Sequence, residues 1–263
     1  MSANIHPSAV VDPGARVGAG VEIGPFCVVG PDVVLGDYVR LISHVVVDGR
    51  TTIGDGTIVY PFASLGHAPQ DLKYKGEPSE LIIGRDNRIR ENVTMNTGTE
   101  GGGMVTRVGN GGLFMVGVHI GHDCDVGDNV IFANNATLGG HVTVGDYAVL
   151  GGLCAVHQWV RIGAHAMIGG MSGVEADVIP YGLVKGDRAY LAGLNLVGMQ
   201  RRGFSREDMH ALRSAFKKLF EGEGDLAARA ATVAAESGEL RSVADVLEFL
   251  GDRGSRALTL PRA

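Results

Sequence analysis

The sequence predicts a parallel β-helix followed by a smaller helical domain, and three features of the chain support this fold class. An apolar residue recurs every six positions from Ile5 to Val174, with two interruptions. The residue after this index position is Gly in 15 of the 26 hexads, which suits a tight corner because Gly adopts backbone angles that other residues avoid. After about Asp187 the pattern changes to the 3.6-residue period of amphipathic helices.

The six-residue repeat predicts a coil of three short strands. In each hexad the index side chain points inward, and the residue four positions later is small or β-branched, which suits a half-buried pleated surface. Three hexads make one coil of 18 residues, and coils stack at a spacing of about 4.8 Å. Cys27, Cys124 and Cys154 share this register, so we expect them to be small buried hydrophobic residues rather than reactive thiols.

Two excursions and a tail interrupt the repeat. Residues 66–82 (GHAPQDLKYKGEPSELI) form a polar excursion and residues 97–107 (TGTEGGGMVTR) a glycine-rich one. Such excursions from a rigid solenoid are where function usually sits. Ser205, followed three residues later by Asp208, is typical of a helix start. We therefore predict a β-helix over residues 1–189 and a helical domain over residues 190–263.

Composition excludes several classes of protein. The 263 residues carry a formal charge of −6 and include 41 Gly but only 9 Pro. Gly without a strict three-residue period excludes collagen, and an acidic chain is a poor candidate for wrapping nucleic acid. No apolar run approaches the roughly 18 residues of a membrane span. With no visible secretory leader and only three Cys, we expect a cytoplasmic protein.

Stacking the coils brings several histidines to one edge of the prism. Residues 18 apart lie one above another, which gives three neighbouring columns: His122, Gly140 and Gln158; Asp123, His141 and Trp159; and Gly121, Gly139 and His157. Allowing for the second excursion, Asn96 lies under Gly121. We therefore expect His122, His141 and His157 to converge within about 10 Å along the prism.

Two kinds of chemistry suit this cluster. Three neutral imidazoles can hold zinc, as in the γ-type carbonic anhydrases, but the close pair in that family is five residues apart, whereas His119 and His122 are three apart. The other chemistry is proton transfer. Asp123 can fix the tautomer of His122, and Gly140 offers an exposed backbone N–H as an oxyanion donor for acyl transfer. A non-catalytic scaffold is a third interpretation, and the histidine columns argue against it.

The chain resembles the UDP-N-acetylglucosamine O-acyltransferases, a family of hexapeptide-repeat acyltransferases, over nearly its whole length. The matching segments are IGPFCVVGP (23–31), SHVVVDG (43–49), QDLKYKGEPSE (70–80), HIGHDCDVGD (119–128), ANNATLGGHVTVGD (133–146), AVHQW (155–159) and RRGFSRE (201–207). The resemblance implies a left-handed β-helix and a homotrimer with sites between subunits. It also implies the first step of lipid A (lipopolysaccharide) biosynthesis. In that step a 3-hydroxyacyl chain passes from the phosphopantetheine of acyl carrier protein to the 3-position of UDP-N-acetylglucosamine, with no bound cofactor or metal.

The resemblance assigns roles to individual residues. His122 is expected to be the general base, with Asp123 as its partner and Gly140 as the oxyanion donor. Asp71 and Lys73, in the first excursion, are expected to bind the sugar and a nearby phosphate. The other expected substrate-binding residues are Asn96, His119, His141 and His157, which line the site, and Gln158, Asn195, Arg201 and Arg202, which hold the nucleotide.

Four positions bear on specificity. The family commonly has His at Asn96, so a 3-amino analogue of the sugar nucleotide stays open as an alternative acceptor. The family often has Glu at the position of Val197, so the Val in this chain removes one expected nucleotide contact. Gly170 matches the position whose side chain closes the acyl groove, and its missing side chain predicts a donor of about twelve carbons or more. Arg188, where His is frequent, is a second candidate for closing the groove.

The acidic acyl carrier protein requires a local basic surface. Arg213, Lys217 and Lys218 lie on one predicted helix, and positions 213 and 217 share a face because they are four residues apart. We therefore expect these three residues to help dock the carrier.

Overall fold

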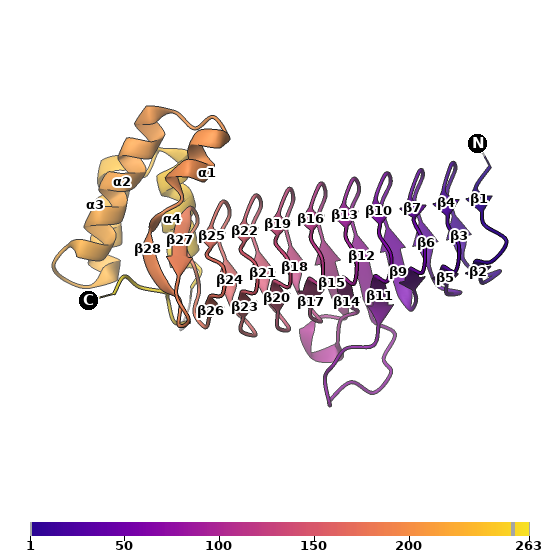
Figure 1. Cartoon of the computed structure of the whole chain (residues 1–263). Helices are drawn as coiled ribbons and strands as arrows, with labels where there is room; N and C mark the ends of the chain where they lie inside the picture. The colour runs from indigo at the N-terminus through magenta and orange to yellow at the C-terminus, as the bar shows by residue number, and fades with distance from the viewer. Residues whose placement is uncertain (1, 254–255, 263) are drawn as a thin grey trace.

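The computed structural model describes residues 2–253 and 256–262 and shows a long three-sided prism with helices at one end (Figure 1). Up to residue 174, short parallel strands alternate among three sheets, so that successive strands of the chain belong to successive sheets. Where the repeat is uninterrupted, paired residues are 18 positions apart, as for Asn4 with Glu22 and Ile120 with Leu138. These three parallel sheets confirm the predicted β-helix.

The strand bounds follow the six-residue repeat. The 11-stranded sheet runs in the order β1 (Asn4–Ile5), β4 (Glu22–Ile23), β7 (Arg40–Leu41), β10 (Ile58–Val59), β13 (Arg88–Ile89), β16 (Leu113–Phe114), β19 (Ile131–Phe132), β22 (Val149–Leu150), β25 (Met167–Ile168), β27 (Gly182–Lys185) and β28 (Tyr190–Leu194). The 9-stranded sheet contains β2 (Val10–Val11), β5 (Val28–Val29), β8 (Val46–Val47), β11 (Ser64–His67), β14 (Thr94–Asn96), β17 (His119–Ile120), β20 (Thr137–Leu138), β23 (Ala155–Val156) and β26 (Gly173–Val174). The 8-stranded sheet contains β3 (Arg16–Val17), β6 (Val34–Leu35), β9 (Arg50–Ile53), β12 (Glu80–Ile83), β15 (Val105–Val108), β18 (Asp125–Val126), β21 (Thr143–Val144) and β24 (Arg161–Ile162).

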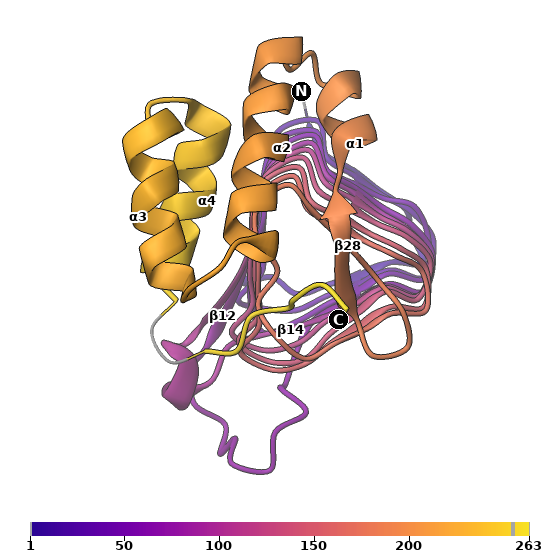
Figure 2. The same ribbon diagram turned by 90° about the vertical axis from the view of Figure 1, so that its left-hand side faces the viewer.

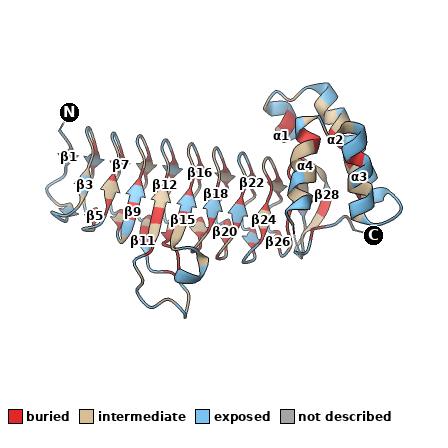
Figure 3. Cartoon of the chain, turned by 180° about the vertical axis from the view of Figure 1, so that it is seen from behind, coloured by how far each residue is buried: buried red, intermediate tan, exposed pale blue. Residues whose placement is uncertain are grey.

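The apolar index residues fill the interior of the prism. Every index residue from Ile23 to Val174 is buried, whereas Ile5 at the N-terminal end is 43% exposed. All three Cys are buried and free, as expected. Full burial of one aliphatic side chain stabilises a fold by about 1.5–3 kcal/mol, so this column is the main source of stability. Figure 3 shows the buried segments recurring along the strands while the protruding loop is largely exposed.

The chain turns three corners in each coil, and every corner carries its own column of residues. The first corner joins the 9-stranded to the 8-stranded sheet, the second joins the 8-stranded to the 11-stranded sheet, and the third joins the 11-stranded to the 9-stranded sheet. Positive φ angles of 57–69° occur at Asp123, His141 and Trp159 on the first corner, Tyr147, His165 and Tyr181 on the second, and Asn135, Leu153 and Met171 on the third. The left-handed backbone at these positions aims the preceding and following strands along different walls.

Both excursions leave the prism at the first corner. The first lies between β11 and β12, and the second lies between β14 and β15 and includes the short 3-10 helix η1 (Glu100–Gly102). Pairing resumes in register after the second, with Met95 opposite Ile120 as expected. Figure 2, which views the prism from its end, shows both excursions projecting from the same side. The two loops therefore meet beside the predicted histidine columns.

The C-terminal end of the prism is closed by a hairpin, four helices and a returning tail (Figure 2). β27 and β28 pair antiparallel, and the helices are α1 (Leu196–Arg201), α2 (Arg206–Glu221), α3 (Leu226–Ser237) and α4 (Arg241–Gly251). The hydroxyl of Ser205 accepts a hydrogen bond from the N–H of Asp208 at 3.0 Å, which caps α2 as the sequence predicts. Within residues 2–253 and 256–262, no helix is both long enough and apolar enough to cross a membrane.

Asn87 is a polar residue inside the prism. Asn87 is fully buried just before β13, and its amide nitrogen donates to the carbonyls of Gly84 and Gly109 at 2.9 and 2.8 Å. Its side-chain oxygen accepts from the N–H of Gly112 at 2.7 Å. A single side chain thus satisfies backbone groups of two neighbouring coils at the second corner, where each coil must turn without a regular ladder bond.

Replacing Asn87 with Ala is expected to lower the free energy of unfolding by about 2–4 kcal/mol, because a buried N–H and buried carbonyls lose their partners. The shift of the urea midpoint followed by circular dichroism measures this loss. Asn134→Ala serves as the matched control, because Asn134 is exposed and its replacement should change stability by no more than about 0.5 kcal/mol. Equal midpoints for the two variants would contradict the role given to Asn87.

Candidate active site

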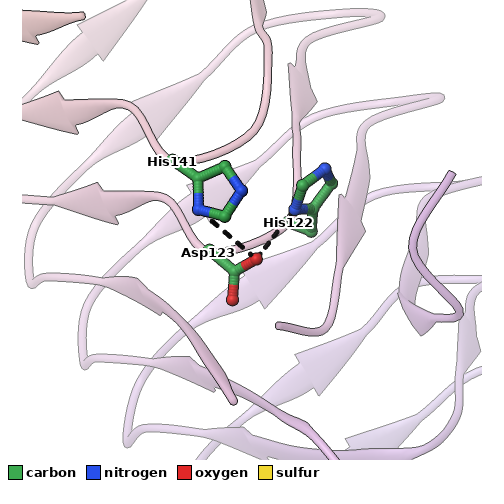
Figure 4. A group of neighbouring side chains, drawn as sticks. All are labelled: His122, Asp123 and His141. Atoms are coloured by element: carbon green, nitrogen blue, oxygen red, sulfur yellow. Dashed lines mark hydrogen bonds and ion pairs between the residues drawn. The ribbon is translucent and has the colours of Figure 1, made fainter. Parts of the chain in front are cut away.

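His122 and Asp123 form a hydrogen-bonded pair at the first corner (Figure 4). The Nδ1 atom of His122 lies 2.8 Å from Oδ2 of Asp123, and the two side chains are 8% and 0% exposed. A carboxylate only accepts hydrogen bonds, so Nδ1 must be the donor. In the neutral imidazole the lone pair is therefore on Nε2, which makes Nε2 the atom that can take a proton.

The second excursion holds the carboxylate of Asp123 in place. The N–H of Thr99 donates to Oδ1 at 2.7 Å, and its hydroxyl donates to Oδ2 at 2.6 Å. Gly102 packs so closely that an added Cβ would lie 2.0 Å from the carboxylate carbon. The backbone N–H of Asp123 donates to the Thr106 hydroxyl at 2.8 Å. These contacts fix the carboxylate, and the carboxylate in turn fixes the imidazole of His122.

Gly140 lies directly against the imidazole of His122. An added Cβ at Gly140 would be 2.3 Å from Cε1 and 2.5 Å from Nε2 of that ring, so a larger residue would displace the imidazole. Among the described residues, the N–H of Gly140 makes no hydrogen bond. The sequence predicts an exposed glycine, but Gly140 is buried because the imidazole covers it.

His141 and His119 surround the pair. The ring of His141 meets that of His122 edge-on, with centroids 4.9 Å apart, and its Nδ1 lies 3.6 Å from Oδ2 of Asp123. Burial lowers the pKa of His141, and the nearby Asp123 carboxylate opposes this shift. Burial also lowers the pKa of His119, whose Nδ1 lies 2.8 Å from the hydroxyl of Thr94. Both imidazoles are therefore neutral at neutral pH.

A cavity of about 550 Å³ opens beside His141. It is lined by both excursions and by the first corner, through Asp71, Lys73, Lys75, Glu77, Thr99, Glu100, Gly101, His141 and Trp159. The structure therefore brings Asp71 and Lys73 to the histidine cluster, although they lie far from it in the sequence. The backbone N–H of Lys73 donates to the Asp71 carboxylate at 2.9 Å, which shapes the tip of the first excursion.

Three other predicted residues lie near this corner. Asn96 ends β14 and is 6% exposed, and its amide nitrogen donates to the carbonyls of His67 and Ala68 at 3.3 and 3.2 Å. Its side-chain oxygen is buried and has no partner among the described residues. His157 and Gln158 follow β23 and are exposed, and Gln158 and Trp159 line a second, shallower cavity with Arg256.

The expected nucleotide-binding residues of the tail lie at a different corner. The amide of Asn195 caps α1 and donates to the carbonyl of His165 at 2.9 Å, on the second corner. The guanidinium of Arg202 donates to the carbonyl of Tyr147 at 2.9 Å and lies over its ring, while Arg201 is exposed. Within one protomer the structure does not bring this group to His122, because the two sets occupy different edges of the prism.

The expected acyl-chain position lies at the third corner. Gly170 is exposed, and an added Cβ would lie 3.3 Å from the carbonyl oxygen and 3.9 Å from the backbone nitrogen of Gly152. Its neighbour Met171 is 73% exposed. Arg188, the second candidate, is exposed and forms an ion pair with Glu175. The three predicted groups of residues therefore lie at three separate corners of one chain.

The His122, Asp123 and His141 side chains present three potential metal-binding atoms within 4.8 Å of one another. The Asp123 carboxylate already accepts two hydrogen bonds from Thr99 and one from His122. A carboxylate has about four lone-pair sites, and three of them accept bonds that tie Asp123 to Thr99 and His122, which suits an orienting role. The donor set thus fits proton transfer better than the alternative zinc interpretation.

Sequence reasoning missed Thr99 and assigned no role to Trp159. Residues 18 apart lie one above another, so the position of Trp159 above His141 was predictable. The stacking of its indole on the imidazole was not, because it depends on side-chain torsion angles. Thr99 lies in an excursion with no repeat, so no register connects it to Asp123. The available signal was a short side chain directly after Gly98 and two residues before Gly101, because glycines permit a close approach of the backbone to a buried carboxylate.

Comparison with known proteins shows the family to which this chain is related. The family model "Udp N-acetylglucosamine O-acyltransferase; Domain 2" matches residues 177–259. The chain is 56% identical to acyl-[acyl-carrier-protein]–UDP-N-acetylglucosamine O-acyltransferase of Caulobacter vibrioides, over 98% of each chain. It is 57% identical to the protein of that name from Rickettsia felis, over 97% of each chain.

Solved structures agree with this relationship. A structure of UDP-N-acetylglucosamine acyltransferase from Campylobacter jejuni superposes with a TM-score of 0.93 and 40% identity, covering 98% of this chain and 100% of the other. Similarity of this extent includes the β-helix, both excursions and the helical end. The chain therefore belongs to the UDP-N-acetylglucosamine O-acyltransferase family.

Proposed function

We propose that this protein transfers a 3-hydroxyacyl chain from acyl carrier protein to the 3-hydroxyl of UDP-N-acetylglucosamine, with His122 as general base, in the first step of lipid A biosynthesis. The observation that carries this proposal is the arrangement of His122, whose Nδ1 is held by Asp123 while Nε2 lies against Gly140. The relatives named above act with the same two substrates by name. The donor enters on the phosphopantetheine of the carrier.

The geometry supports an ordered set of proton movements. Nε2 of His122 accepts the proton of the acceptor hydroxyl as that oxygen attacks the thioester carbonyl. The N–H of Gly140, which has no other partner among the described residues, stabilises the negative oxygen of the tetrahedral intermediate. When the intermediate collapses, the carbon–sulfur bond breaks and the imidazolium returns its proton to the leaving thiolate. Asp123 stabilises the imidazolium between these two steps.

We infer that the complete site forms between copies of this chain in a homotrimer. His122 lies at the first corner, Arg201 and Arg202 lie at the second, and Gly170 lies at the third. Rigid walls separate the three corners, so no loop movement within one chain brings them together. A neighbouring prism that presents its second corner to the first corner of this one would supply the paired arginines, whose fork geometry suits a pyrophosphate.

Replacement of His122 with Ala is expected to lower turnover by roughly 10²–10⁴-fold, the contribution of general acid–base catalysis. A radiolabelled acyl-transfer assay on purified protein measures this effect, and circular dichroism checks the fold. His6→Ala is the control, because His6 is exposed at the N-terminal end of the prism, several coils away from His122. If a folded His122→Ala protein keeps most of the activity, His122 is not the general base. If the wild-type protein loses activity in EDTA and recovers it when zinc is added, the metal interpretation is favoured.

Replacement of Gly170 with Met is expected to shift donor preference toward a ten-carbon chain. Gly170 has no side chain to close a groove along the third corner, and each additional buried methylene contributes about 0.8 kcal/mol to binding. Competition between ten- and fourteen-carbon acyl carrier proteins, read by mass spectrometry of the products, measures the preference. The same assay with a 3-amino analogue of UDP-N-acetylglucosamine tests whether the acceptor carries a 3-hydroxyl or a 3-amino group, the question that Asn96 raises. A wild-type preference for the ten-carbon donor would show that Gly170 does not set the chain length, and Arg188 or the exposed Met171 would then be the candidate for closing the groove.

Charge reversal at Arg213 and Lys217 is expected to raise KM for acyl carrier protein and to weaken its dependence on salt. Both residues are exposed on α2, whereas Lys218 is paired with Glu236 of α3 and is less available to a partner. Steady-state kinetics at several ionic strengths measures the change. Arg16→Glu, on β3 far from the helices, is the control, and an unchanged KM in the double variant would place the docking surface elsewhere.

A further inference from the structure

Trp159 is the single tryptophan of the chain, and its indole stacks on the imidazole of His141. The ring centroids are 3.7 Å apart and the ring planes are within 6° of parallel. The residue is 51% exposed at the first corner and lines both the cavity beside Asp71 and Lys73 and the shallower cavity beside Gln158. A large aromatic side chain therefore forms a wall that the two cavities share.

The stacking matters because, within residues 2–253 and 256–262, the ring of His141 is held only by contacts with neighbouring rings. Its Nδ1 is 3.6 Å from Oδ2 of Asp123, which is too long for a hydrogen bond. That oxygen already accepts from His122 and from the hydroxyl of Thr99. Among the described residues, no hydrogen bond reaches the imidazole of His141, so its orientation depends on the face of Trp159 and the edge of His122.

Trp159 is itself held from two directions. Its backbone N–H donates to the carbonyl of Gly140 at 3.2 Å. Its carbonyl accepts a hydrogen bond from the guanidinium of Arg256 in the returning C-terminal tail. The tail is anchored in turn, because the N–H of Thr259 donates to the carbonyl of Asp177 at 2.9 Å. The backbone of Trp159 is thus held by the prism on one side and by the tail on the other, and its indole lies on the imidazole of His141.

We propose that Trp159 is a positioning residue for His141, holding the imidazole so that Nε2 faces the cavity as a ready-made hydrogen-bonding group for the sugar nucleotide. Figure 4 shows Nδ1 of His141 directed toward Asp123, with the other ring nitrogen on the opposite side. The charged and titratable groups around this ring are Asp123 and His122 from the corner and Asp71 and Lys73 from the first excursion. The proposal rests on the proposed function, because it treats the sugar nucleotide as the ligand of the cavity.

The kinetic consequence is a loss of binding rather than of chemistry. Without the indole, the imidazole of His141 samples several orientations, and the substrate must select one of them. Trp159→Leu is expected to raise KM for UDP-N-acetylglucosamine about tenfold while kcat stays within about twofold, the pattern of a lost uniform binding interaction. Trp159→Phe keeps an aromatic face and is expected to retain nearly the wild-type KM.

A double-mutant cycle tests whether Trp159 acts through His141. His141→Ala is expected to raise KM by at least as much as Trp159→Leu, and the double variant should be no worse than His141→Ala alone. Tyr38→Leu is the control for removing an exposed aromatic residue at a positive-φ corner, because Tyr38 is 56% exposed and lies far from the site. Additive effects in the double variant, or a wild-type KM in Trp159→Leu, would overturn the proposal.

The single tryptophan also supplies a readout that does not depend on turnover. An imidazolium quenches the fluorescence of a stacked indole, so the emission of the wild-type protein is expected to fall as the pH is lowered and His141 becomes protonated. The titration should be absent in His141→Gln. An identical titration in that variant would show that the quenching comes from a group other than His141 and would overturn the inference. A wild-type protein that shows this titration but no acyl transfer would instead overturn only the proposed function.

Discussion

The 18-residue register of the parallel ladder determines the rest of this structure. Each coil must bring its strands into line with the coil below, so an inward position stays inward and a corner stays a corner along the whole prism. Backbone hydrogen bonds and the apolar column enforce this register together, because a slip of one residue would turn every buried index side chain outward. Chemistry can then be assembled by stacking single residues from successive coils, as it is at His122 and Gly140, or at Asp123, His141 and Trp159.

The register also explains how much the sequence could predict. The six-residue spacing was sufficient for the fold, for the buried cysteines and for the meeting of His122, Asp123 and His141, because all of these follow from counting residues within a repeat. The approach of Asp71 and Lys73 was not derivable in this way. Those residues lie in an excursion, and their placement came from resemblance. Thr99 was missed for the same physical reason, because its backbone path is set by glycines and by a buried carboxylate rather than by a ladder.

The burial of Gly140 shows a second limit of counting along a repeat. Its column position was correct, but its exposure was not, because the side chain of His122 folds over the glycine. Asn195 is a comparable case, since the capping bond to Gly198 and the bond to His165 occupy its amide. Counting in steps of 18 residues predicts where the backbone of each residue lies. The torsion angles of neighbouring side chains decide which polar groups remain accessible to a ligand.

The two ends of the prism differ in how they protect their strand edges. At the C-terminal end the antiparallel β28 and the returning tail cover the last coils, with Leu191 bonded to Leu260 and Asp177 bridged to Leu258. At the N-terminal end β1 is two residues long and Ile5 is 43% exposed. A parallel ladder can extend from molecule to molecule only if the C-terminal end of one prism pairs with the N-terminal end of the next. Closing one end therefore prevents filament growth, even though β1 at the opposite end is the edge strand of its sheet and pairs only with β4 among the described residues.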